Sequence, residues 1–271
     1  MPVKFPRQSD LVRRVAPVAT CVALAVGLCG CQTSGPSDIT GSLGEKAEAR
    51  TSDPRRDLDT YRERFKADPK DSDAAIKYGK ALRATGQKAQ AVAVLEQASL
   101  SSPNNQALLA GYGRALADNG NFQRAFDVLG RAHKPEDPDW TILSAQGATL
   151  DQLGRFDEAR QYYASALKIV PDEPSVLCNL GLSYVLSKEL PKAEEMLRRA
   201  HELAGSDMRV RANYALVIGL QGRMNEAEAI IKADLSPDEA AANVAALKQM
   251  LTRKRASADN KFPVASTKRS N

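Results

Sequence analysis

Residues 140–173 read WTILSAQGATLDQLGRFDEARQYYASALKIVPDE, and this stretch decides the fold. Its first half places a small residue, Gly147, among apolar residues at helical spacing, and its second half does the same around Ala159. Gly154 separates the halves and Pro171 closes the stretch. Glycine favours a helix end because it adopts a left-handed backbone easily, and proline stops a helix because it lacks an N–H group. The stretch therefore predicts two helices joined by a short turn.

The same pattern recurs along the chain with a period of 34 residues. The first small residue recurs as Gly79, Gly113, Gly147 and Gly181, and the second as Ala91, Ala125, Ala159, Ala193 and Ala227. The turn glycine recurs as Gly86, Gly120, Gly154 and Gly222, with Lys188 interrupting the series. The repeats begin near Ser72, Gln106, Trp140, Pro174 and Met208. Columns that keep register over five periods indicate a repeat protein.

These columns resemble the tetratricopeptide (TPR) pattern, in which each repeat is a helical hairpin. Small residues at the eighth and twentieth positions let the two helices of a hairpin approach closely, and large apolar residues fill the rest of the interface. One hairpin cannot bury its apolar face alone, so neighbouring hairpins must stack. We therefore expect an all-α fold, a TPR α-solenoid that winds as a right-handed superhelix over residues 72–235, with a capping helix at each end.

The segments that flank the repeats predict these capping helices. Residues 53–71 carry three apolar residues at helical spacing. Residues 236–256 begin with Ser236 and have Glu239 three positions later, which is the signature of a helix start. The residues expected to close the end of the stack are Val244, Leu247 and Leu251. Residues 257–271 are polar and basic, and we expect them to form a disordered tail.

The beginning of the chain has the parts of an export signal. Its start is positively charged, and residues 15–28 are uncharged but too few to span a bilayer core, which needs about 20 residues as a helix. Residues 28–31, LCGC, resemble the box that directs lipid onto a bacterial lipoprotein. We therefore expect residues 1–30 to be a signal peptide, Cys31 to carry a covalent lipid, and residues 31–52 to form a flexible tether. The alternative is an ordinary secretory signal without a lipid.

The composition gives no support for an enzyme or a metal centre. Once the signal is removed, Cys178 is the single cysteine besides Cys31, and neither His133 nor His201 lies in a catalytic motif. The formal net charge of +5 includes four cations and one anion of the signal, so about +2 remains, and this balance says little about partners. Because an exported, lipid-anchored chain rarely meets nucleic acid, we expect no nucleic-acid partner. We predict no catalytic residue, no metal, no cofactor apart from the lipid on Cys31, and no small-molecule substrate.

Several longer stretches resemble one particular family. They are GCQTSGPSDITGSLG after the signal, DPDWTILSAQGATLDQLGRFDEARQYYASAL, NLGLSYVL and RVRANYALVIGLQGRMNEAEAI in the repeats, and ANVAALKQML near the end. Together they are similar to the TadD family, the TPR lipoproteins of tight-adherence (Flp/Tad) pilus assembly.

This resemblance implies an outer-membrane lipoprotein at the periplasmic face that helps to assemble or localise the pilus secretin, a pilotin-like role without catalytic residues. Gln32 follows the lipidated cysteine, and the absence of Asp at that position agrees with sorting to the outer membrane. An alternative is a TPR lipoprotein of another envelope system, either a type IV pilus pilotin or an adaptor for cell-wall enzymes.

A partner would bind along the concave groove that the first helix of each repeat lines in TPR superhelices. The predicted groove residues are the cations Lys77, Lys80, Arg83 and Arg114, the apolar Leu182, Val185 and Leu216, and the asparagines Asn179 and Asn213. Both asparagines occupy the sixth position of a repeat, where a side-chain amide can hold the backbone of an extended ligand because it both donates and accepts hydrogen bonds. The cations would face acidic residues. Alternatively, the cations are solvated and the asparagines bond to neighbouring backbone or to the C-terminal helix.

Overall fold

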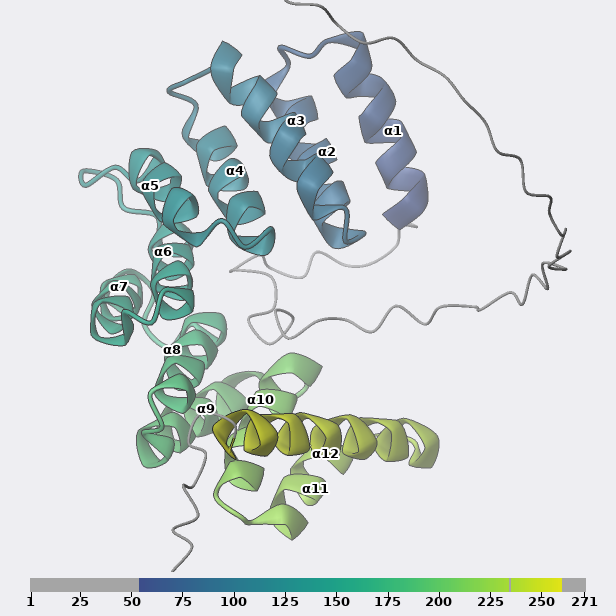
Figure 1. The fold of residues 1–271 in the computed structure, drawn as a ribbon, viewed down its shortest axis with the longest axis vertical. Helices are drawn as coiled ribbons and strands as arrows, with labels where there is room; N and C mark the ends of the chain where they lie inside the picture. The colour runs from purple at the N-terminus through teal and green to yellow at the C-terminus, as the bar shows by residue number, and fades with distance from the viewer. Residues whose placement is uncertain (1–53, 234, 260–271) are drawn as a thin grey trace, which may run out of the picture. The chain divides into compact units, whose positions relative to one another are not determined.

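The computed structural model describes residues 54–233 and 235–259, which form twelve α-helices (Figure 1). These two ranges contain no β-strand, and the helices belong to one compact unit, Pro36–Asn271. The prediction of an all-α fold is confirmed. The predicted signal peptide, the tether and the lipidated Cys31 lie outside the described residues.

Ten of the described helices form five hairpins, each made of an A helix and a B helix. The A helices are α2 (Ser72–Ala84), α4 (Gln106–Asp118), α6 (Trp140–Gln152), α8 (Pro174–Leu186) and α10 (Met208–Leu220). The B helices are α3 (Lys88–Ser101), α5 (Phe122–Ala132), α7 (Phe156–Ile169), α9 (Leu190–Ala204) and α11 (Met224–Lys232). Both series begin every 34 residues. Each A helix packs on its own B helix and on the next A helix, as far as α10.

A capping side chain directly precedes each A helix. The five capping residues are Asp71, Asn105, Asp139, Glu173 and Asp207. Asp71, for example, accepts hydrogen bonds from the backbone N–H groups of Asp73 and Ala74 at 2.9 and 3.1 Å. The first N–H groups of a helix lack partners within it, so such a cap stabilises the helix start by about 1 kcal/mol. The repeat therefore contains a column that sets where each A helix begins.

The turn between the A and B helices requires a left-handed backbone. Gly86, Gly120, Gly154 and Gly222 have φ angles between +76° and +86°. In the fourth repeat Lys188 occupies this place with φ 66°. A non-glycine residue pays a steric cost there, so Lys188 is a point of local backbone strain.

A second set of glycines permits the close contact between the two helices of a hairpin. A Cβ atom built on Gly79 or Gly113 would lie 2.6 Å from a side-chain atom of Leu95 or Leu129, respectively. In the third and fourth repeats the same atom would lie 2.7 Å from Tyr163 and 2.5 Å from Leu197. At these distances the neighbouring side chain would have to shift to admit even a methyl group, so the eighth position of these repeats favours glycine.

One helix packs at each end of the hairpins. At the N-terminal end, α1 (Pro54–Ala67) packs on α2 and buries Phe65. At the C-terminal end, α12 (Pro237–Asp259) packs on α10 and α11 (Figure 1). Its buried side chains include Val244, Leu247 and Leu251. Leu251 lies so close to α10 that a Cβ on Gly219 would be 2.8 Å from it.

One boundary differs from the expectation. The last helix runs to Asp259 rather than ending near residue 256, since Ala256 and Ala258 favour a helix and no glycine or proline interrupts it before Pro263. Arg211 is buried at a position that is apolar in other repeats, and its Nη1 donates to the Ala233 carbonyl oxygen at 2.8 Å.

Within the described ranges, no helix combines the length and the apolar character needed to cross a membrane.

Candidate protein-binding face on the A helices

The second, fifth, sixth, ninth and twelfth residues of each A helix lie on one side of that helix, because an α-helix has 3.6 residues per turn. We call these residues of α2, α4, α6, α8 and α10 the A-helix face. All nine groove residues predicted from the sequence belong to it. Four of them make contacts between successive A helices, two are exposed lysines of α2, and the remaining three are buried apolar residues.

The two predicted asparagines bond to the preceding A helix. Nδ2 of Asn179 donates to Oγ of Ser144 at 3.0 Å, which joins α8 to α6. In the same way, the side chain of Asn213 in α10 hydrogen-bonds the Cys178 side chain in α8. In both pairs a sixth-position asparagine meets the fifth-position residue one repeat earlier. Their partners are thus neighbouring side chains, rather than the backbone or the C-terminal helix named in the sequence-based alternative.

These bonds orient the asparagines and leave part of each amide for a ligand. A primary amide has two N–H donors and an oxygen acceptor, and the bond to Ser144 uses one donor of Asn179. Both asparagines are partly exposed. Burial raises the pKa of the Cys178 thiol to about 12, so the thiol remains protonated beside Asn213.

The three predicted apolar residues are buried. Leu182 and Val185 in α8 are 6 % and 7 % exposed, and Leu216 in α10 is 1 % exposed. Leu216 shares a hydrophobic cluster with Val244 and other residues of α12. The expectation that these side chains offer an open apolar surface is therefore not met in this conformation, because they serve the packing of the repeats.

The four predicted cations lie in α2 and α4, and both arginines bond to the next A helix. Nε of Arg83 is 2.6 Å from the Asp118 carboxylate, and Nη2 of Arg114 donates to Oγ1 of Thr141 at 2.7 Å. Each bond joins successive A helices. Lys77 and Lys80 are exposed. The predicted positive surface is therefore concentrated on the lysines of α2.

A buried carboxylate of the A-helix face joins the third and fourth repeats, through contacts that were not predicted from the sequence. Asp151, at the twelfth position of α6, is 6 % exposed. It accepts hydrogen bonds from the hydroxyls of Tyr163 in α7 at 2.8 Å and Ser183 in α8 at 2.6 Å. Burial raises the pKa of Asp151 to about 6, although both hydroxyls and the nearby Arg160 favour the charged form.

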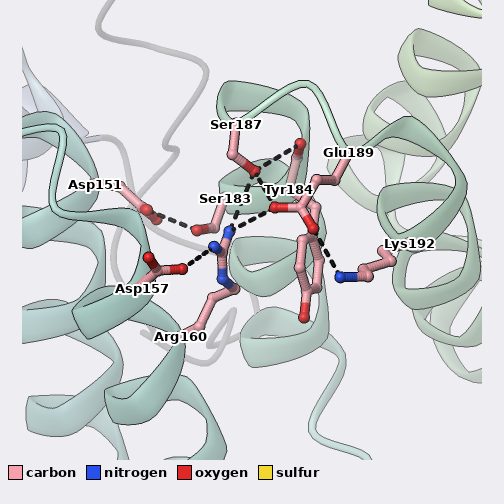
Figure 2. Close-up of polar contacts among 8 residues, drawn as sticks. All are labelled: Asp151, Asp157, Arg160, Ser183, Tyr184, Ser187, Glu189 and Lys192. Carbon is pink, nitrogen blue, oxygen red and sulfur yellow. Dashed lines mark hydrogen bonds and ion pairs between the residues drawn. The ribbon is translucent and has the colours of Figure 1, made fainter.

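Arg160 makes a second set of contacts beside this carboxylate (Figure 2). Its guanidinium pairs with Asp157 on its own helix, donates to Oγ of Ser187 at 3.1 Å and lies 3.3 Å from Glu189. It also stacks over the Tyr184 ring, 4.9 Å from the ring centroid. These contacts fix α7 to the turn between α8 and α9, so the boundary between repeats three and four is held by polar groups.

Tyr163 is the signal that could have revealed this boundary. Its column holds leucine or isoleucine in the other repeats, and its hydroxyl reaches Asp151 on the facing helix.

Among the described residues, no group of three or more His, Cys, Asp or Glu side chains is arranged to hold a metal ion.

Comparisons with known proteins agree with this architecture. Two tetratricopeptide-repeat family models match residues 76–139 and 141–206. No curated protein sequence is significantly similar to the chain.

Solved structures share the arrangement of helices at low sequence identity. The crystal structure of PilW, described as a widely conserved type IV pilus biogenesis factor, has 19 % identity and a TM-score of 0.56, over 67 % of this chain and 86 % of PilW. The APC/C hetero-tetramer Cut9-Hcn1 has 15 % sequence identity and a TM-score of 0.55, over 65 % of this chain and 35 % of the matched chain. Human IFIT1, solved as a dimer with m7Gppp-AAAA, has 14 % sequence identity and a TM-score of 0.56, over 66 % of this chain and 46 % of the IFIT1 chain. The chain is therefore a tetratricopeptide-repeat protein, an all-α scaffold for protein–protein interaction.

Proposed function

We propose that this protein is a lipid-anchored scaffold of the bacterial envelope that helps to assemble or localise a Flp/Tad pilus secretin. The observation that carries the proposal is the combination, in one chain, of a lipoprotein-like box at residues 28–31 with TPR hairpins. The similarity to the TadD family, given above on five stretches of sequence, supplies the pilus system. The role is pilotin-like and requires neither a catalytic residue nor a cofactor.

The proposed anchor is a lipid on Cys31. At about 0.8 kcal/mol for each buried methylene, two or three acyl chains hold a protein on a bilayer essentially permanently. The proposed location is the periplasmic face of the outer membrane, which the Gln32 after the lipidated cysteine supports. Residues 31–52 would act as the tether between the lipid and the first helix.

The proposed partner contact is the A-helix face. Asn179 and Asn213 are oriented by bonds to the preceding helix, and an extended segment of the partner would use the remaining groups of their amides. TPR proteins are typically scaffolds rather than enzymes, and the A-helix face provides regularly spaced polar groups that suit an extended chain.

A second candidate is a TPR lipoprotein of another envelope system. Its support is the likeness to PilW, which is described as a type IV pilus biogenesis factor. An adaptor for cell-wall enzymes belongs to the same class of function. These candidates differ from the first in the partner, and not in the mode of anchoring or binding.

Affinity capture from detergent-solubilised envelopes tests the proposal. The full chain is compared with Cys31→Ala in the organism's own envelope, and captured proteins are identified by mass spectrometry. We expect the wild type to fractionate with the outer membrane and to recover a secretin, and Cys31→Ala to lose the membrane fraction. Recovery of type IV pilus components or a murein hydrolase instead would favour the second candidate. An acyl-free wild type in the soluble fraction would refute the anchor.

A further inference from the structure

The boundary between the third and fourth repeats buries more polar groups than the rest of the described chain. Six polar or charged side chains are buried among the described residues, and five of these lie in α6 and α8. They are Ser144, Gln146, Thr149 and Asp151 in α6 and Ser183 in α8. A buried polar group costs free energy unless it has a hydrogen-bond partner. The contact between these two A helices therefore depends on specific polar bonds as well as on apolar packing.

Asp151 joins the three helices that meet at this boundary. One of its oxygens accepts a hydrogen bond from Oγ of Ser183 in α8 at 2.6 Å, a bond drawn in Figure 2. The other oxygen accepts from the hydroxyl of Tyr163 in α7 at 2.8 Å. Nearer the start of α6, the bond from Asn179 to Ser144 also crosses from α8 to α6, at 3.0 Å. Movement of α8 away from α6 breaks both of the bonds that join these two helices.

Both connections of α8 have strained backbone. Asp172, in the turn before the helix, has φ 61°, and Lys188, in the turn after it, has φ 66°. In the described ranges these are the two non-glycine residues with a positive φ. This conformation costs free energy for a residue with a side chain, and strain of this kind is common in segments that switch between two positions. The helix that carries Ser183 is therefore held between two strained turns.

The carboxyl of Asp151 changes its charge close to neutral pH. Burial raises its pKa from the ordinary value of 3.8 to about 6. The groups that face it are the hydroxyls of Ser183 and Tyr163 and the nearby guanidinium of Arg160, and all of them favour the charged form. The Tyr163 hydroxyl keeps its proton, because burial raises its pKa well above the ordinary value. The cost of burying the charge thus outweighs three favourable contacts.

Two further carboxylates lie beside this cluster, and both face Arg160. Asp157 pairs with its guanidinium, and Glu189 lies 3.3 Å from it. Glu189 remains ionised near neutral pH, because a hydrogen bond from Lys192 lowers its pKa. These pairs hold α7 against the turn that follows α8, whereas Asp151 joins the helices themselves.

We propose that the boundary between the third and fourth repeats is a proton-controlled joint, in which α8 separates from α6 and α7 more readily once Asp151 has lost its proton. Separation lets water reach the carboxylate, and a charged carboxylate gains far more from hydration than a neutral carboxyl does. Protonation therefore favours the closed joint fully below pH 3.8, and this preference is lost as the pH rises through about 6. Opening divides the A-helix face between α6 and α8. The inference goes beyond the scaffold role and depends on neither the lipid nor the pilus partner.

Hydrogen–deuterium exchange of the purified full chain, measured from pH 5 to pH 8 and corrected for the intrinsic rate at each pH, tests the proposal. A carboxyl that titrates at about 6 in the closed joint and at 3.8 in the open one makes opening about tenfold more frequent over this range. We expect the protection of α8 to fall by this factor and that of α2 and α3 to stay constant. Constant protection in α8, or an equal loss in every repeat, would overturn the proposal.

Asp151→Asn removes the charge and keeps the shape of the side chain, so the protection of α8 should no longer depend on pH. The matched control is Asp118→Asn, which removes the carboxylate that Arg83 binds between the first two A helices. This control should leave the pH response of α8 as in the wild type. If the protection of α8 in Asp151→Asn still falls as the pH rises, the joint is not controlled by this carboxyl and the inference is wrong.

Ser183→Ala gives an independent test in which Asp151 is retained. It removes a hydrogen bond that favours the charged carboxylate, so the pKa of Asp151 should rise and the fall in the protection of α8 should move to higher pH. Circular dichroism checks that the variant keeps its helical content. A fall at the wild-type pH, or at lower pH, in the folded Ser183→Ala variant would contradict the proposal.

Discussion

Burial raises the pKa of Asp151 from its ordinary value of 3.8 to about 6 in the folded protein, because it disfavours the charged carboxylate. Between these two values the folded chain holds a proton that the unfolded chain has released. The protonated carboxyl of Asp151 therefore contributes fully to the free energy of unfolding below the pKa of the unfolded chain. This contribution is lost as the pH rises through about 6.

We expect Asp151→Asn to remove this pH dependence, since asparagine has the same shape and no charge. The difference in unfolding free energy between the variant and the wild type should grow with pH by on the order of 3 kcal/mol. Urea unfolding from pH 4 to pH 7 measures it, a range that brackets the pKa of Asp151. Asp157→Asn, at a carboxylate whose side chain is 93 % exposed, is the control. A constant difference across the range would contradict the burial argument.

Lys188 offers a second test at one position. Lys188→Gly is expected to raise the unfolding free energy by about 0.5–1 kcal/mol, because glycine adopts the φ of 66° without steric cost. The reciprocal control is Gly154→Ala, at φ 76°, which should lower it by a similar amount. Chemical denaturation monitored by circular dichroism decides the sign, and a loss of stability in Lys188→Gly would show that the turn is not strained.

Packing between the two helices of a hairpin depends on the eighth-position glycine. In Gly147→Ala the new Cβ would lie 2.7 Å from the ring of Tyr163, whose hydroxyl is bonded to Asp151 and cannot move freely. We expect a loss of about 1–3 kcal/mol in unfolding free energy. Gly111→Ala, where the Cβ has room, should instead gain up to about 1 kcal/mol. Equal effects of the two substitutions would contradict the role of close approach.

The C-terminal helix α12 is expected to stabilise the last repeats. Leu247 is buried against α10 and α11, so Leu247→Ala should cost about 2–4 kcal/mol. Gln249→Ala, on the exposed side of the same helix, is the matched control. Hydrogen exchange should show faster opening of α10 and α11 in Leu247→Ala and little change in α2. Uniform opening along the whole chain would contradict nearest-neighbour stacking.

The helices were predictable from the sequence because their causes are local and repeat. The turn glycines and the eighth-position glycines recur every 34 residues, and the helices of the structure begin at the same interval. The capping column that includes Asp71 and Asp139 has the same spacing and could have been read as well. Where the pattern fails, as at Lys188, the backbone keeps the left-handed turn at the cost of strain.

The contacts on the A-helix face could not be predicted in the same way. Periodicity says that Asn179 and Arg83 lie on one side of their helices, but it does not say which residue of the neighbouring helix comes within bonding distance. That depends on the rotation and spacing of successive A helices, which place Ser144 beside Asn179 and Asp118 beside Arg83. The burial of Leu216 likewise follows from the packing of α12.

Across the described residues, the core consists of three hydrophobic clusters in chain order. The first runs from Phe65 to Ala148, the second from Leu143 to Leu180, and the third from Leu177 to Leu251. Residues of α6 belong to the first two clusters, and Tyr184 packs against the second and the third. Each repeat is therefore stabilised by its neighbours, and the A-helix face depends on the whole stack for its geometry.

Hydrogen–deuterium exchange of the full chain, with and without the protein that it captures from envelopes, tests most directly whether the A helices are the binding surface. The account predicts added protection on the A helices, strongest in α2, α4, α8 and α10, with the B helices α3, α5, α7 and α9 unchanged. Protection confined to the B helices, or a partner that leaves the A helices unprotected, would contradict it.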